Sequence, residues 1–182
     1  MAAIHDLTVT ESGQAFLIRE GLEMDAEAVY RFKQVAFQET DWMLQTWGDM
    51  NTDPDKEAYF LRRFQSSPNS LYLVALQEKE VIGTLSLVGG SFQRTEHVAS
   101  LGLGVVQNWW GNGVGKRLME LSIHWAEQHS TLRKLNLQVY HTNDRAIGLY
   151  LRLGFQQEGR LRQEVMLDDQ TEIDLIQMAR FV

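Results

Sequence analysis

A glycine-punctuated segment, Gln107 to Met119, constrains this 182-residue chain more than any other part of the sequence. It reads QNWWGNGVGKRLM, follows the apolar run 98–106 and leads into an amphipathic pattern at 118–128, so a strand is expected to enter a helix here. Glycine adopts backbone conformations that other residues avoid and lets the backbone approach a ligand closely. The start of a helix adds free N–H groups and the positive end of its dipole. The segment therefore predicts a phosphate or pyrophosphate site.

The glycines alone do not identify the ligand. The loop lacks the Lys-Ser/Thr ending of a P-loop, because Gly115 is followed by Lys116 and Arg117. It also lacks the acidic residue that a dinucleotide site carries about twenty residues further on. A tight strand-to-helix turn without a ligand is the simpler alternative, so a second motif is needed.

That second motif runs from Asn143 to Phe155, after an apolar strand expected at 135–140. Together the two segments resemble the GNAT superfamily of N-acetyltransferases, which use acetyl-CoA. The loop fits the family signature Gln/Arg-x-x-Gly-x-Gly/Ala at Gly113 and Gly115. The later family pattern, Asn-x-x-Ala-x-x-Leu-Tyr-x-x-x-Gly-Phe, is met at every fixed position by Asn143, Ala146, Leu149, Tyr150, Gly154 and Phe155. The resemblance covers about residues 15–180.

The resemblance implies one α/β domain over residues 1–182. Its fold would have a mixed, mostly antiparallel sheet of six to seven strands, splayed in the middle and flanked by about four helices. The sequence pattern agrees, with strands expected at 15–19, 72–77, 81–88, 98–106 and 135–140, and two more within 159–182 around the turn pair Asp168-Asp169. Helices are expected at 24–38, 54–65, 118–129 and 144–153. Residues 1–12 carry little signal and are expected to form a loose arm.

Composition excludes several classes of function. A formal net charge of −7 argues against general nucleic-acid binding. No apolar run has the length of a membrane span, and residues 1–6 lack the features of a signal peptide, so a cytoplasmic protein is expected. The absence of cysteine excludes disulfides, thiolate metal ligands and a cysteine nucleophile, and no metal site is expected.

The resemblance also implies how acetyl-CoA would bind. In GNAT enzymes the strand before the glycine loop presents backbone groups to the pantetheine arm, a role that falls here on Leu103, Gly104 and Val105. The N–H of Val105 matches the group that polarises the thioester carbonyl. Asn143 matches an asparagine that contacts the pantetheine, although it could instead cap the following helix. The residues expected around the pyrophosphate are Gly111, Asn112, Gly113, Val114, Gly115 and Lys116.

CoA is a polyanion and the chain is acidic, so the attraction has to be local. Backbone N–H groups of the loop would supply it together with Lys116 and Arg117, and the alternative is that both side chains simply face solvent. Trp110 stands where the family usually has glutamine or arginine. This departure removes a polar contact near the phosphates and leaves the backbone donors in place.

Tyr150 is the expected general acid. A phenol with a pKa near 10 is protonated at neutral pH and can give its proton to the CoA sulfur, the role of the matching tyrosine in the family. The alternative is an aromatic residue that only packs on its helix face.

The general base is less well defined. Gln138 stands where some ribosomal-protein acetyltransferases carry a glutamate, and Ala99 stands where histone-type members carry one. His97 lies two residues before Ala99, on the same face of an expected strand, and its pKa near 6.5 suits a base acting directly or through water. Glu96 is the neighbouring alternative, and a structural histidine is the simpler one. A reaction without a dedicated base, in which the amine arrives partly deprotonated, also fits the sequence.

The predicted function is acetyl-CoA-dependent N-acetylation of a small-molecule primary amine, such as an amino acid or a polyamine. Trp42 and Trp47, in the connection 41–50, are expected to bind an amine with an apolar body, or else only to cover the core. Residues 95–99 and 172–179 resemble bacterial members that acetylate amino acids or the N-termini of ribosomal proteins, so a protein N-terminus is the runner-up. Dimers are common in the family, and a homodimer paired through the last strands would fit.

A non-catalytic acyl-CoA-binding module is the alternative from another class of function. Gln138 and the missing base suggest it. Tyr150 argues against it, because a pure binding protein has no need of a phenol that protonates a thiol.

Overall fold

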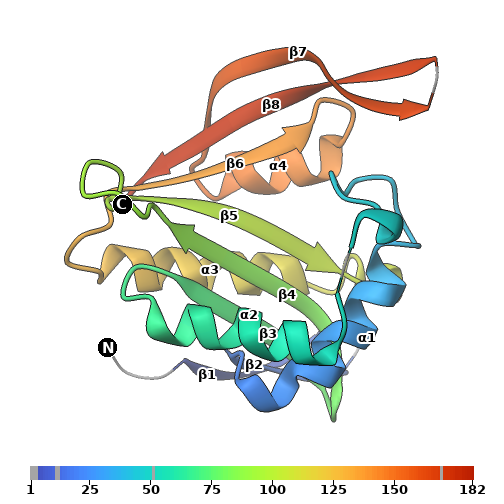
Figure 1. Ribbon diagram of the computed structural model, residues 1–182, viewed down its shortest axis with the longest axis vertical. Helices are drawn as coiled ribbons and strands as arrows, with labels where there is room; N and C mark the ends of the chain where they lie inside the picture. Colours follow the sequence, from blue (N-terminus) through green and yellow to red (C-terminus); the bar gives the residue numbers. More distant parts are fainter. Residues whose placement is uncertain (1–3, 11–12, 51, 169) are drawn as a thin grey trace.

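The strands of the described part of the chain join one open sheet that is covered by helices on both faces (Figure 1). The computed structural model describes residues 4–10, 13–50, 52–168 and 170–182. Within these residues eight strands follow the order β1-β2-β3-β4-β5-β6-β8-β7, and every neighbouring pair is antiparallel except β5 and β6. The strands are β1 (His5–Val9), β2 (Ala15–Glu20), β3 (Leu71–Gln77), β4 (Glu80–Gly89), β5 (Val98–Val105), β6 (Lys134–Tyr140), β7 (Gln156–Asp168) and β8 (Thr171–Phe181). The helices are α1 (Ala26–Ala36), α2 (Pro54–Ser66), α3 (Val114–Glu127) and α4 (Asp144–Arg152).

The sheet separates two hydrophobic cores. Helices α3 and α4 pack on one face, where Leu118 and Tyr150 belong to the larger core, and α1 and α2 pack on the other, where Val29 and Leu61 belong to the smaller one. Strand β3 is buried on both faces, because alternate residues of 71–76 enter the two cores. This layered arrangement confirms the expected α/β fold with a mostly antiparallel sheet and four helices.

Residues 5–9 form a strand in place of the loose arm expected for 1–12. Strand β1 pairs antiparallel with β2, with His5 opposite Arg19 and Val9 opposite Ala15. Its apolar residues Leu7 and Val9 point to solvent, with 69% and 61% of their surface exposed, so the segment has no inward apolar pattern that would reveal a strand. Residues 1–3 and 11–12 of the expected arm lie outside the described residues. The extra strand brings the sheet to eight instead of six to seven.

The helix boundaries follow local signals. Pro54 begins α2, and Asp53 caps it by accepting the N–H of Lys56 at 2.9 Å. Helix α3 begins at Val114, four residues before the amphipathic pattern, because Gly113 already serves as its N-cap. The turn expected at Asp168-Asp169 connects β7 and β8, although Asp169 itself lies outside the described residues. None of the described helices is long and apolar enough to cross a membrane.

An ion pair joins α1 to α2. Lys33 Nζ lies 2.7 Å from Glu57 Oε2, and the glutamate is 2% exposed. Thr52 donates a further hydrogen bond to Glu57 at 2.6 Å, and Lys33 Nζ lies 4.7 Å from the centre of the Phe60 ring. Because both charges are largely withdrawn from water, each depends on the other.

We expect Glu57→Ala to lower the free energy of unfolding by about 3 kcal/mol, the usual result of removing one partner of a buried ion pair. Glu27→Ala is the matched control, because Glu27 and Arg31 form an exposed pair at 3.3 Å on α1 and should contribute less than about 0.5 kcal/mol. Denaturant unfolding of both variants measures the difference. Equal losses of unfolding free energy in the two variants would show that water solvates the Lys33 ammonium group once Glu57 is removed.

Candidate active site

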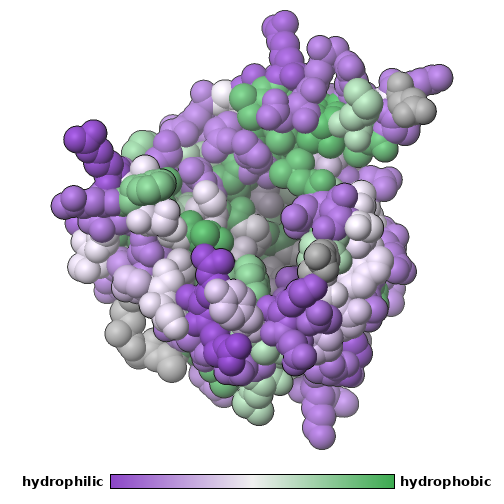
Figure 2. Space-filling model, viewed as in Figure 1, coloured by the Kyte–Doolittle hydropathy of each residue, from purple (hydrophilic) through white to green (hydrophobic). Residues whose placement is uncertain are grey.

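A cavity of about 780 Å³ opens where β5 and β6 separate. The two strands pair only over Val98–Ser100 and Lys134–Asn136 and then diverge. The cavity is lined by both strands, the glycine loop, α4, Gln177 of β8 and the connection between α1 and α2. The face shown in Figure 2 is hollowed near its centre. The separation of two neighbouring strands thus creates the space for a ligand.

The edge of β5 that borders the gap presents backbone groups to the cavity. Val106 donates its N–H to Ile82 at 3.1 Å, so the backbone groups of alternate residues point to β4. Those of Leu103 and Val105 therefore point away from β4, toward the gap. Residues 100–105 all line the cavity, including Leu103, Gly104 and Val105, which the resemblance assigns to the pantetheine.

The glycine loop forms the expected strand-to-helix turn. Gly111 and Gly113 both have φ +82°, a left-handed conformation that side-chain-bearing residues rarely adopt. Gly113 is the N-cap of α3 and provides no side chain to cap it, and no acidic residue occupies the first turn. The N–H groups of Val114, Gly115 and Lys116 therefore lack intrahelical partners and are available to an anion.

All of the expected pyrophosphate residues except Asn112 line the cavity. Asn112 instead directs its side-chain amide to the carbonyl of Trp110 at 3.4 Å. Gly115 differs from Gly111 and Gly113, because neither a left-handed backbone nor a lack of space requires glycine there. A Cβ there would meet Leu103 and Val105 at ordinary contact distances of 3.5 and 3.6 Å.

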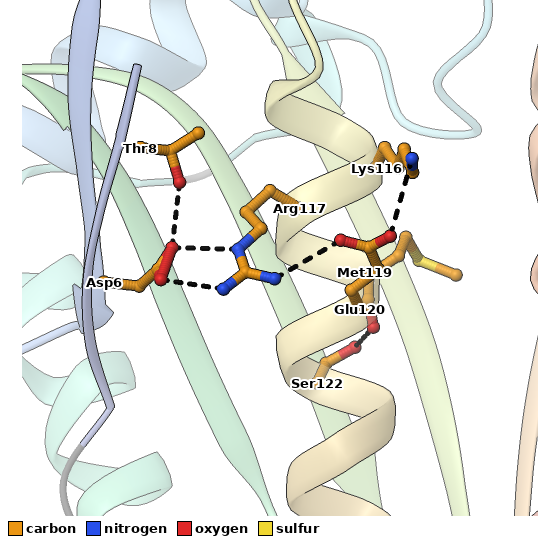
Figure 3. Close-up of polar contacts among 7 residues, drawn as sticks. All are labelled: Asp6, Thr8, Lys116, Arg117, Met119, Glu120 and Ser122. Carbon is orange, nitrogen blue, oxygen red and sulfur yellow. Dashed lines mark hydrogen bonds and ion pairs between the residues drawn. The ribbon is translucent and has the colours of Figure 1, made fainter. Parts of the chain in front are cut away.

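The two cations beside the loop, Lys116 and Arg117, differ in the ion pairs that they form (Figure 3). Arg117 forms a bidentate pair with Asp6 of β1, at 2.9 and 2.8 Å, and lies 3.4 Å from Glu120. The hydrogen bond to Asp6 is the main reason that the pKa of Arg117 is raised. Lys116 lines the cavity and lies 3.7 Å from Glu120, a looser ion pair. Of the two cations expected to attract CoA, only Lys116 is placed to do so.

Among the described residues that line the cavity, every charged side chain is a cation. These residues are Lys116, Arg145 and Arg152, and no acidic residue accompanies them. A positive cavity in a chain of net charge −7 resolves the conflict between the acidic composition and an anionic ligand. Arg145 and Arg152 occupy variable positions of the second motif, so its fixed positions gave no signal for them.

Trp110 stands where the family usually has a polar residue, and its side chain makes two specific contacts. Its indole N–H donates to the carbonyl of Val105 at 2.7 Å, and the guanidinium carbon of Arg145 lies 4.9 Å from the centre of its ring. The first contact fixes the loop on the end of β5. The second holds Arg145 beside the glycine loop.

Tyr150 lies on α4 with its ring in the core and is 8% exposed. Burial raises the pKa of its phenol to about 12. No described residue forms a hydrogen bond with the hydroxyl, yet no fully buried side-chain oxygen among the described residues lacks a partner. The hydroxyl therefore retains access to the cavity that Tyr150 lines. Burial thus keeps this phenol protonated and leaves its hydrogen-bonding capacity for a ligand.

Asn143 caps a helix and also borders the cavity. Its Oδ1 accepts the N–H of Ala146 at 3.1 Å and so caps α4, and the residue also lines the cavity. The cap fixes the start of the helix that carries Tyr150.

His97 lies outside the cavity lining, in an exposed turn before β5. Its carbonyl accepts the N–H of Arg133 at 2.8 Å, which ties the turn to the start of β6. Val105 lies eight residues further along the chain, about 26 Å at the rise of a strand. This placement argues against His97 as the general base, because the strand that would have aligned it with Ala99 begins only at Val98. Glu96, in the same exposed turn, is equally remote.

The two tryptophans expected to bind the substrate differ in position. Trp42 lines the cavity and packs edge-on against Tyr140, with ring centroids 6.1 Å apart. Trp47 lies outside the lining and packs against Tyr30 of α1, with centroids 5.7 Å apart. Trp47 therefore supports the connection rather than a ligand. Asn136 and Gln177 also line the cavity and had no signal in the sequence.

The sequence profile of the Acetyltransferase (GNAT) family matches residues 36–155. The chain belongs to the GNAT family. A GNAT acetyltransferase structure from Streptococcus pneumoniae is 28% identical, with a TM-score of 0.89 over 92% of this chain and 99% of that one. The L-amino acid N-acetyltransferase of Escherichia coli (strain K12) is 29% identical over 65% of this chain and 72% of its own length. The [ribosomal protein uS5]-alanine N-acetyltransferase of the same strain is 29% identical over 51% of this chain and 47% of its own length.

Membership confirms the family resemblance and makes the protein an acetyl-CoA-dependent GNAT acetyltransferase. The cavity agrees with that donor. Unpartnered N–H groups at the start of α3 and cations on α3 and α4 border the cavity beside the free edge of β5, an arrangement that suits a polyanion.

The two glycines that flank Val114 should respond differently to alanine. Gly113→Ala forces a left-handed conformation on a residue with a side chain, at about 1–2 kcal/mol, and should raise the Kd for acetyl-CoA about tenfold because the loop shifts. Gly115→Ala should be tolerated or slightly stabilising, because alanine favours a helix and its Cβ has room. Calorimetric titration and thermal unfolding measure both effects. Equal behaviour of the two variants would contradict this distinction.

Lys116 and Arg117 form a second matched pair. Lys116→Met should raise the KM for acetyl-CoA severalfold and weaken its dependence on salt, because one charge is removed beside the anion. Arg117→Met should instead lower thermal stability through the loss of the Asp6 pair and change the salt dependence little. Steady-state kinetics between 50 and about 300 mM salt tests this. A weaker salt dependence in Arg117→Met than in Lys116→Met would reverse the assignment.

Proposed function

We propose that the protein transfers the acetyl group of acetyl-CoA to the primary amine of a small molecule, with Tyr150 as the general acid. The support is the convergence, in one cavity, of the β5 edge, the anion-binding loop and a buried phenol with an available hydroxyl. An amino-acid derivative fits better than a polyamine, because no acidic residue is found among the described lining residues.

In the proposed reaction the neutral amine attacks the thioester carbonyl, a new C–N bond forms and the C–S bond breaks. The N–H of Val105, at the cavity edge, would stabilise the negative charge on the carbonyl oxygen. The Tyr150 hydroxyl would donate its proton to the departing sulfur, and solvent would restore it. The amine nitrogen releases a proton to water. The loop and Lys116 hold the diphosphate, which fixes the position of the thioester.

A protein N-terminus is the second candidate acceptor. It is supported by the similarity to the ribosomal-protein-alanine acetyltransferase, over half of this chain. A non-catalytic acyl-CoA-binding module is less well supported. A pure binding protein would gain nothing from a hydroxyl kept protonated and available at the cavity.

Tyr150→Phe tests the proposed chemistry. We expect kcat to fall at least about 100-fold, as for other general acids, while the Kd for acetyl-CoA changes less than about threefold. Because burial raises the pKa of Tyr150 to about 12, kcat of the unmodified enzyme should not decline through loss of this proton below pH 10. Release of free CoA with a panel of amines provides the assay.

The control is Tyr59→Phe, which changes an exposed tyrosine of α2 outside the cavity lining and should leave kcat unaltered. Similar losses of kcat and acetyl-CoA affinity in Tyr150→Phe would indicate a packing role instead. Absence of turnover with every amine would leave the protein N-terminus and the binding module as the remaining candidates.

A further inference from the structure

The acceptor side of the cavity is lined by uncharged polar groups on the face of α1 and α2. Leu137 belongs to the core beneath α3 and α4, so strand alternation places Asn136 and Gln138 on the opposite face. Gln177 lies opposite Gln138 on β8, and Gln138 Nε2 donates to Gln177 Oε1 at 3.1 Å. The gap between β5 and β6 connects this amide surface to the side where Tyr150 lies.

The connection between α1 and α2 provides an apolar wall above the amides. Trp42, Met43 and Leu44 all line the cavity. The Tyr140 hydroxyl donates to the carbonyl of Met43 at 3.1 Å and its ring meets Trp42 edge-on, so the end of β6 holds this wall in place. An acceptor in this compartment meets amide groups on one side and an aromatic and aliphatic surface on the other.

The compartment contains no group that could act as a base, as far as the described lining residues show. The ionisable residues of the cavity are Lys116, Arg145, Arg152 and Tyr150, and all of them lie on α3 or α4. Burial and, after it, the negative charge of Asp41 raise the pKa of Tyr140. Four further ionisable groups of the surrounding elements lie outside the lining and have partners. They are Glu39 with the N–H of Gln107 (2.7 Å), Lys33 with Glu57 (2.7 Å), Asp174 with Arg160 (2.5 Å) and His141 with the N–H of Asp174 (3.2 Å).

An amine that enters such a compartment has to lose its proton to water before it attacks. An α-amine next to an amide has a pKa near 7.8, whereas an alkylamine such as that of lysine has one near 10.4. At pH 7.5 about one third of the first is neutral, but only about one part in eight hundred of the second. A carboxylate next to the amine would raise the amine's pKa and would itself enter without a cation beside it.

We propose that the acceptor is an α-amine next to an uncharged amide, as in an amino-acid amide or the first residue of a peptide, and that Asn136, Gln138 and Gln177 bind this amide. The inference rests on the function proposed above. Asn and Gln side chains offer a donor and an acceptor, which match the N–H and C=O of an amide. Gln138 Oε1 and Gln177 Nε2 have no other partner among the described residues and remain for the ligand.

Three acceptors with one side chain test the proposal: L-leucinamide, L-leucine and 3-methylbutylamine. At pH 7.5 we expect kcat/KM for leucinamide to exceed that for the alkylamine by about 100-fold or more and that for leucine by at least about tenfold. Between pH 6 and 10 the apparent pKa in kcat/KM should follow the amine of each acceptor. Equal use of the three, or one apparent pKa shared by acceptors whose amines differ, would overturn the proposal.

The variant Asp41→Asn tests whether a residue outside the cavity lining acts as the base. Asp41 is exposed and outside the lining, so the variant should keep the pH profile of the unmodified enzyme. Loss of the pH dependence would identify Asp41 as the base and overturn the proposal. The peptide Leu-Gly-Gly distinguishes the two sources of the same chemistry. Better use of the peptide than of leucinamide indicates a peptide terminus, and better use of leucinamide indicates a small molecule.

Gln138→Leu tests the amide contact directly. We expect the KM for leucinamide to rise about threefold to tenfold, the effect of losing one hydrogen bond, with the Kd for acetyl-CoA unchanged. Gln157→Leu, on the exposed face of β7, is the control and should change neither. An unaltered KM in Gln138→Leu would overturn the assignment of this residue. Turnover that favours leucine refutes only this inference, whereas absence of CoA release with every amine refutes the proposed function as well.

Discussion

Strands β5 and β6 pair over only three residues and then diverge, which leaves the inner edge of β5 without a neighbouring strand. Backbone N–H and C=O groups along a free edge need partners, and water or a ligand with its own amide groups can provide them. The same divergence connects the two faces of the sheet, so donor and acceptor can approach from opposite sides. A single interruption of strand pairing thus produces both a binding edge and a passage.

Charge is distributed to suit this passage. The chain is acidic overall, but the described charged residues of the cavity wall are cations on α3 and α4. They lie beside the N–H groups at the start of α3 that have no hydrogen-bond acceptor within the helix. The face of α1 and α2 contributes amides, an aromatic ring and aliphatic side chains. The two halves of the cavity therefore differ in chemistry: one suits a polyanion and the other suits an uncharged group.

The local backbone geometry of the motifs that are continuous in sequence agrees with the expectation, because it depends only on neighbouring residues. Gly113 with φ +82° and the capping Asn143 follow from a few neighbouring residues, and both motifs line one cavity. The functional roles of Tyr150 and Val105 remain proposals. Features that depend on pairing between distant segments could not be predicted from the sequence. Gln177 reaches the cavity only because β8 lies beside β6, and Arg117 contacts a partner 111 residues away. The expected alignment of His97 with Ala99 on one strand face is not found, because His97 lies in the turn before β5.

The bidentate ion pair between Asp6 and Arg117 has a practical consequence for the preparation of this protein. The bidentate contact joins the outermost strand of the sheet to the first turn of α3, the turn that carries the anion-binding N–H groups. An affinity tag, a fusion partner or a trimmed expression boundary placed close to Asp6 would therefore act on the glycine loop from the β1 edge of the sheet. Preparations that differ only at that end of the chain could give different donor affinities.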